Sequence, residues 1–145
     1  MPRLTAKDWR ASHLPLRATA GAFMLGSGLQ KRDADEQTAQ GLQGFASYAV
    51  PPVQQLEPQQ FAKALSSGEI ALGAALLTPK VPSWLAGAGL TAFALGLNRL
   101  YLKAPGQRRE GSLAPTDEGL GIAKDIWLTG MGLALLVDAW RGRRR

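Results

Sequence analysis

Apolar residues in this chain gather into four blocks that polar segments separate. The first block begins at Leu14, reads LPLRATAGAFMLGSGL, and is closed by Gln30 and Lys31. A helix that crosses a bilayer needs about 20 mainly apolar residues, and each block approaches this length once its flanks are included. The pattern predicts spans at residues 14–30, 59–78, 82–102 and 121–138.

The second and third blocks are joined by a very short polar segment. Only Thr78, Pro79 and Lys80 separate them, which is too few residues to cross a bilayer, so we expect an antiparallel hairpin. The third block is the clearest predicted span because no charged residue interrupts it from residue 81 to 97. Small residues at a spacing that allows close helix packing in lipid occur at Ala88, Ala92 and Gly96, and again at Gly130 and Ala134.

The polar segment 31–58 predicts a connection with a short interfacial helix within residues 41–53, where apolar residues include Phe45 and Tyr48. Basic residues gather in the tails 1–13 and 139–145, which places both termini on the cytoplasmic side by the positive-inside rule. The predicted fold is an all-α, membrane-embedded four-helix bundle that forms a single domain over residues 1–145. A secretory signal peptide is the alternative interpretation of the first block.

The composition and charge of the chain argue against several classes of function. The net charge is +6 and the isoelectric point is about 10.2, but the basic residues flank apolar blocks instead of forming a basic face with aromatic residues, so we do not expect nucleic-acid binding. The chain has no cysteine and one histidine, His13, and so cannot by itself build an iron–sulfur cluster, a thiolate zinc site or a bis-histidine haem. We expect that no serine–histidine–carboxylate set, phosphate loop or metal-spaced cluster can be assembled from this chain, which argues against an autonomous hydrolase or kinase.

Charged residues inside the predicted spans are the candidate site, because ionisable groups at membrane depth are costly and face a partner or a cavity. Arg17 is expected near the end of the first span, with its charge reaching water. Three roles stay open for Glu69: a neutral acid, an ion pair with Arg17, or part of a ligand pocket. Arg99, Lys124 and Asp125 are expected at one depth, where the geometry allows an Arg99–Asp125 pair. Lys124 points to a different helix face from Asp125.

Three segments carry a family resemblance. The sequences LRATAGAFMLGSGLQK, SGEIALGAALL and AKDIWLTGMGLALL resemble the DoxX-like family of small four-helix bacterial membrane proteins. Residues that match the family pattern are Arg17, Lys31, Glu69, Gly73, Lys124 and Asp125. The first polar connection is longer here than in many members of that family.

The resemblance implies a multi-pass protein of the bacterial plasma membrane that acts as an accessory or assembly subunit of a membrane oxidoreductase or respiratory complex. The resemblance implies that the protein has no redox centre of its own. It implies a larger membrane protein complex and lipids as partners, and it leaves open whether the protein forms a homo-oligomer. The alternative is a quinone-binding subunit, with a quinone or lipid held near Glu69 and Arg17. A small transporter is a third candidate, which only the intramembrane charges support.

Overall fold

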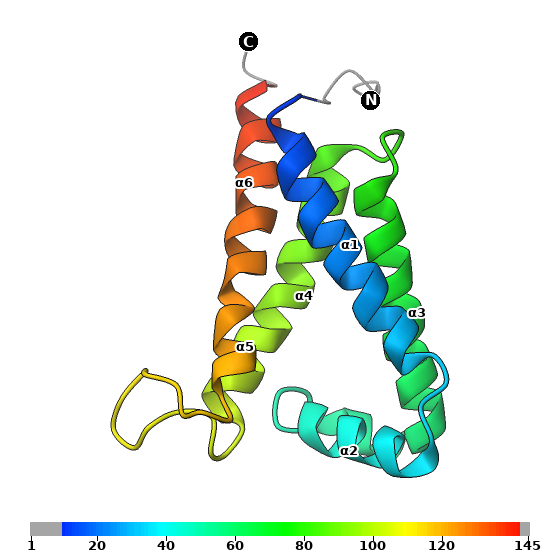
Figure 1. Ribbon diagram of the computed structural model, residues 1–145, viewed down its shortest axis with the longest axis vertical. Coiled ribbons are helices and arrows are strands. Elements are labelled where there is room, and N and C mark those ends of the chain that lie inside the picture. Colours follow the sequence, from blue (N-terminus) through cyan, green and yellow to red (C-terminus); the bar gives the residue numbers. More distant parts are fainter. Residues whose placement is uncertain (1–9, 143–145) are drawn as a thin grey trace.

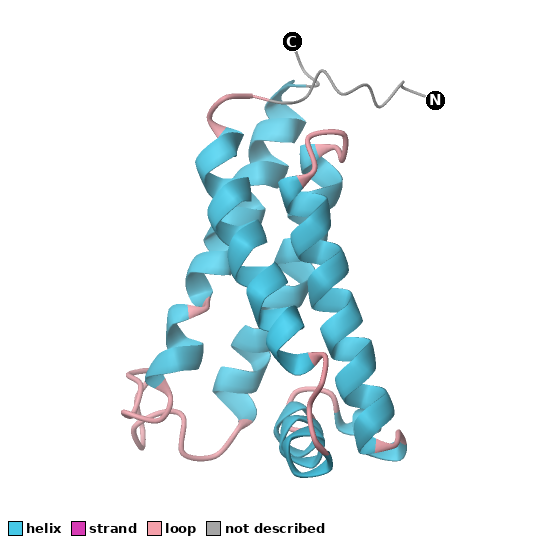
Figure 2. Ribbon diagram, turned by 45° about the vertical axis from the view of Figure 1, so that its right-hand side comes forward, coloured by secondary structure: helices cyan, strands magenta, loops and turns pink. Residues whose placement is uncertain are grey.

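The computed structural model describes residues 10–142, and within them the chain is entirely helical apart from its connections (Figures 1 and 2). The termini 1–9 and 143–145, which carry much of the two basic tails, lie outside the described residues. The elements are α1 (His13–Lys31), α2 (Glu36–Ala46), the 3-10 helix η2 (Pro51–Gln55), α3 (Pro58–Leu77), α4 (Ser83–Lys103), α5 (Leu120–Lys124) and α6 (Ile126–Gly142).

The four long helices form two pairs that diverge from one end of the molecule. In Figure 1, α1 lies along α3 on one side, α4 and α6 form the other side, and α2 lies across the open end between them. The predicted hairpin is confirmed, since α3 ends at Leu77 and α4 begins at Ser83 and runs in the opposite direction, away from α3 toward the wide end. Arg10 and His13 both bind Asp138 near the end of α6, so the described chain begins and ends at the narrow end.

Glycines bring α1 and α3 into backbone contact. A Cβ atom added at Gly73 would lie 2.5 Å from the backbone nitrogen of Leu25, and one at Gly28 would lie 2.8 Å from the backbone nitrogen of Ile70. No side chain fits at either position without moving backbone. Small residues at the contact allow the two helix backbones to approach this closely.

The pair α4 and α6 packs in the same way, through Gly87, Thr91 and Gly132. A Cβ atom at Gly132 would be 2.8 Å from the backbone nitrogen of Thr91, and one at Gly87 would be 3.1 Å from the carbonyl oxygen of Gly132. The predicted small-residue stripes therefore fall on the wrong residues. Gly96 and Gly130 have no atom of another helix close to where their Cβ atoms would be, because the contact face lies elsewhere on both helices.

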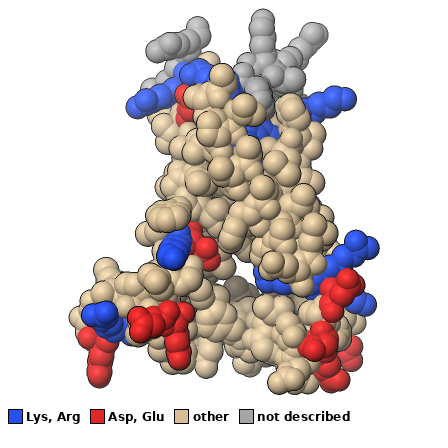
Figure 3. All heavy atoms as spheres, viewed as in Figure 1, with Lys and Arg blue, Asp and Glu red and all other residues tan. Residues whose placement is uncertain are grey.

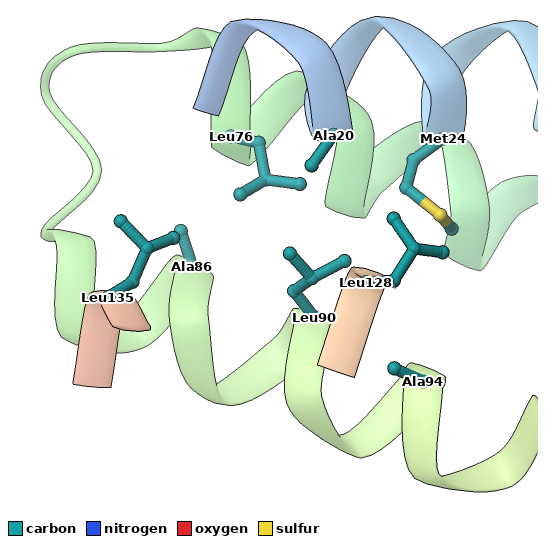
Figure 4. Close-up of a cluster of buried hydrophobic side chains, with 8 residues drawn as sticks. All are labelled: Ala20, Met24, Leu76, Ala86, Leu90, Ala94, Leu128 and Leu135. Carbon is teal, nitrogen blue, oxygen red and sulfur yellow. The ribbon is translucent and has the colours of Figure 1, made fainter. Parts of the chain in front are cut away.

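The main hydrophobic core fills the narrow half of the molecule, where the two pairs meet. Met24, Leu90 and Leu135 are completely buried there (Figure 4). Small residues such as Ala20, Ala86 and Ala94 complete this cluster. A separate small cluster of Ala49, Leu100 and Ala104 lies at the wide end, so the helices are held at both ends of the divergence.

Two predicted boundaries are corrected. A short helix does occur in segment 31–58, but α2 begins at Glu36 because Asp35 accepts a hydrogen bond from the backbone nitrogen of Thr38 at 2.7 Å and caps the helix. The fourth block is broken at Asp125 into α5 and α6, where the backbone nitrogens of Asp125 and Leu128 bond to carbonyls three residues earlier. These tight bonds interrupt the regular α-helical ladder.

Two of the helical segments, Ser83–Lys103 and Leu120–Gly142, are long and apolar enough to cross a membrane by length and composition. The other two predicted spans do not meet that criterion, so the four-span arrangement is not established by these helices alone. On the face shown in Figure 3, charged side chains gather at the two ends of the molecule and at the level of α5, with a mainly uncharged surface between them.

Candidate functional site

The space between the diverging helix pairs is a cavity of about 390 Å³. Its walls come from α1, α3, α4 and α5, and the segment from α2 to η2 closes its wide end. Apolar side chains provide most of the lining, including Phe23, Phe45, Phe61 and Phe93. Its polar lining is a small group formed by Ser27, Lys31, Glu69 and Asp125. A mainly apolar cavity with a few convergent polar groups is the usual form of a small-molecule site.

Lys31 and Glu69 form an ion pair in the cavity wall. The Lys31 Nζ lies 3.0 Å and 3.2 Å from the two carboxylate oxygens of Glu69, and it also donates to the Ser27 Oγ at 2.5 Å. Glu69 is only 3% exposed, and the Lys31 ammonium compensates for the loss of water around its carboxylate. The pair forms because α1 ends at Lys31 and because Gly28, one turn earlier, lets α3 approach closely enough for Glu69 to reach it.

Asp125 faces the same cavity from the break between α5 and α6. Its carboxylate lies within electrostatic range of both Lys31 and Glu69, which gives the polar group two acids and one base. Within residues 10–142, no hydrogen bond is assigned to its carboxylate oxygens. The site therefore offers an unused hydrogen-bond acceptor beside a compensated ion pair.

Two ion pairs that the sequence left open are not formed among the described residues. Glu69 binds Lys31 instead of Arg17, and Arg99 donates from its Nε to the carbonyl of Ala49 at 2.7 Å instead of binding Asp125. Arg99 points toward the wide end of the molecule, where it ties α4 to the segment after α2. Arg99 and Asp125 belong to the same helix pair, but the Arg99 side chain turns away from the α5–α6 segment toward Ala49, whereas Asp125 lines the cavity.

Arg17 has a structural position outside the cavity. It is 2% exposed, and its five donor hydrogens are used by five bonds, to the carbonyls of Ala75, Leu76, Thr78 and Val81 and to the Ser83 Oγ. The expectation that its charge reaches water is wrong, because the guanidinium turns inward. There it satisfies the last carbonyls of α3, which have no partner within their own helix.

The structure also brings together a serine, a histidine and a carboxylate, so the expectation that no such set can be assembled is wrong. The His13 ring lies 2.9 Å from the Ser83 Oγ and 2.6 Å from Asp138. Ser83 is 1% exposed, and its oxygen also accepts a hydrogen bond from Arg17. The set joins the ends of α1, α4 and α6.

Of the predicted site residues, Glu69 and Asp125 therefore share the cavity, and Lys31, which the resemblance had matched, completes the group. Lys124 is exposed and lines a neighbouring surface groove. Sequence reasoning missed Ser27, although its position one turn before Lys31 was a usable signal. Comparisons with protein-family models, with curated proteins and with solved structures found no match to this chain.

Proposed function

We propose that this chain is an integral membrane protein whose four long helices cross the bilayer, and that it is a quinone-binding subunit of a larger membrane oxidoreductase complex. The observation that carries the proposal is the apolar cavity with the Lys31–Glu69 pair and Asp125 in its wall. Membership in the DoxX-like family and the bacterial plasma membrane remain predictions from the sequence.

Exposure of the apolar helices supports the membrane location. Only 33% of the apolar window in α4 and 17% of that in the α5–α6 segment are buried, whereas a core helix of a water-soluble protein is mostly buried. Large side chains on the outside include Leu95, Ile126, Trp127 and Trp140. Such a surface needs lipid or a partner protein to cover it.

The charged residues of α1 and α3 are compatible with the proposal that these two helices also cross the bilayer. These helices contain 19 and 20 residues, which at about 1.5 Å per residue matches a hydrocarbon core of about 30 Å. Their low hydropathy comes in part from Arg17 and Glu69, and both side chains are turned into the protein and bonded there. Neither charge is therefore presented to lipid.

The polar group favours a neutral head over an anionic one. Lys31 is the one basic residue among the described residues that line the cavity, and it is already paired with Glu69, so the lining offers no unpaired cation to a phosphate or carboxylate head. A quinol hydroxyl can donate to Asp125, and the apolar walls accommodate the ring. The accessory role is the second candidate, and the exposed apolar face of α6 favours it because that face suits a partner helix.

Membrane location is tested by extraction with alkaline carbonate, which leaves an integral protein in the membrane pellet. Ligand binding is tested with purified protein in nanodiscs, by calorimetric titration with a decyl-substituted benzoquinone. Gly96 lines the cavity, and a side chain there meets open space, so Gly96→Phe fills the cavity and is expected to abolish binding.

A matched control exists at Gly130, which is equally open and lies outside the cavity lining. Gly130→Phe is expected to bind as the wild type does. Equal binding by the wild type and Gly96→Phe would exclude this cavity as the quinone site.

A further inference from the structure

A second depression adjoins the cavity on the outside of the molecule. It is a groove of about 460 Å³ between α1 and the α5–α6 segment, lined mainly by apolar side chains such as Ala20, Leu128 and Met131. Its surroundings include the exposed Phe23 and Trp127, at 52% and 68% exposure. In the proposed orientation of the helices, this groove faces the lipid.

Two residues line both the groove and the cavity. Phe23 on α1 and Asp125 at the break in the fourth block belong to each, so they separate the two spaces. Few residues of α1 and α6 contact each other, in contrast with the close glycine contacts within each helix pair. The seam between α1 and α6 is therefore packed less tightly than the interface within either helix pair.

The sizes of the two spaces indicate how a quinone would divide between them. The cavity, at about 390 Å³, lies at the small end of ligand sites and suits a substituted ring, while a long alkyl chain needs additional apolar volume. The groove provides that volume next to Asp125, and its walls are apolar as a chain requires.

We propose that the groove between α1 and the α5–α6 segment is a lateral portal, through which a long-chain quinone enters from the bilayer and in which its chain remains while its ring occupies the cavity beside Asp125. This inference rests on the proposed function, because it assumes that the ring binds in the cavity. Phe23 is the side chain that must turn aside for the ring to pass. Its exposed position leaves room for that rotation.

The test compares two ligands and three variants in nanodiscs. The ligands are a decyl-substituted dimethoxybenzoquinone and the same ring with no alkyl chain. Gly121→Phe fills the groove, since a side chain at Gly121 meets open space and that residue lines the groove alone. Gly96→Phe fills the cavity, Gly130→Phe is the control, and each variant must keep the wild-type melting temperature to within a few degrees.

The expected result is that Gly121→Phe weakens binding of the decyl compound by about tenfold or more, the loss expected from exposing two or more methylene groups, and leaves the chainless ring unaffected. Equal affinity of the wild type and Gly121→Phe for the decyl compound would overturn the portal and leave the cavity site intact. Failure of the wild type to bind either compound would overturn the proposed function and the portal with it. A phospholipid found by mass spectrometry in the groove and not displaced by the decyl compound would also overturn the portal.

Discussion

The Nζ atom of Lys31 lies 3.0 Å from the Oε2 atom of Glu69, although the two residues are 38 positions apart in the chain. Lys31 is the last residue of α1, and Glu69 lies in the second half of α3. The Glu69 side chain is almost completely buried, whereas about a quarter of the Lys31 side chain is exposed. The pair thus marks a boundary between the protein interior and the cavity.

Removing one member of this pair should destabilise the protein. Lys31→Met leaves the Glu69 carboxylate buried without its partner, and we expect a loss of about 2 kcal/mol in the free energy of unfolding, below the value for a fully buried pair because Lys31 is partly exposed. The double variant Lys31→Met with Glu69→Leu should regain most of this loss. Unfolding in mixed micelles measures both, and a double variant less stable than Lys31→Met would contradict this account.

Arg17→Met should be more damaging. It leaves the carbonyls of Ala75, Leu76 and Thr78 without their donor at the end of α3, at about 1 kcal/mol or more for each, so we expect a loss of about 3 kcal/mol. Arg17→Lys keeps the charge but lacks the planar set of five donors, and should be intermediate. Melting temperatures in mild detergent give the order. A lysine variant as stable as the wild type would show that charge alone matters at this position.

Gly73→Ala should separate α1 from α3. The added Cβ atom would lie 2.5 Å from the backbone nitrogen of Leu25 and cannot be relieved by a side-chain rotation. We expect a loss of about 1–3 kcal/mol, the typical cost of overpacking. Gly26→Ala is the matched control on α1, because a Cβ atom there meets no atom within 4 Å. Unfolding in mixed micelles separates the two, and equal stability of both variants would contradict the close backbone contact between α1 and α3.

Asp35 should make the stability of the first turn of α2 depend on pH. Its hydrogen bonds with Thr38 hold the pKa of this exposed carboxyl below the ordinary value. The stabilisation of α2 is therefore complete above the ordinary pKa of an aspartate, about 3.9, and is lost as the pH falls through the lower folded value. The amide resonance of Thr38 in an NMR titration follows this change. Asp35→Asn also caps a helix but has no titrating charge, and should remove the transition.

The sequence by itself determined the helical class and the approximate position of each long helix, because apolar blocks of sufficient length between polar segments leave few alternatives. It also determined the antiparallel hairpin of α3 and α4, since the segment from Thr78 to Lys80 is too short for any other connection. Glu69 and Asp125 could be identified as candidate site residues from the local sequence as well. A charge within an apolar block is conspicuous without any knowledge of its neighbours.

Only the tertiary structure decided which charges meet. Arg17 binds carbonyls 58 to 64 positions away in the chain, and a backbone carbonyl leaves no mark on the sequence as a partner. The set formed by His13, Ser83 and Asp138 comes from three helices and depends on how their ends converge. The cavity, too, exists because Gly28 and Gly73 hold α1 against α3 while α4 packs on α6, so that the two pairs diverge and leave space between them.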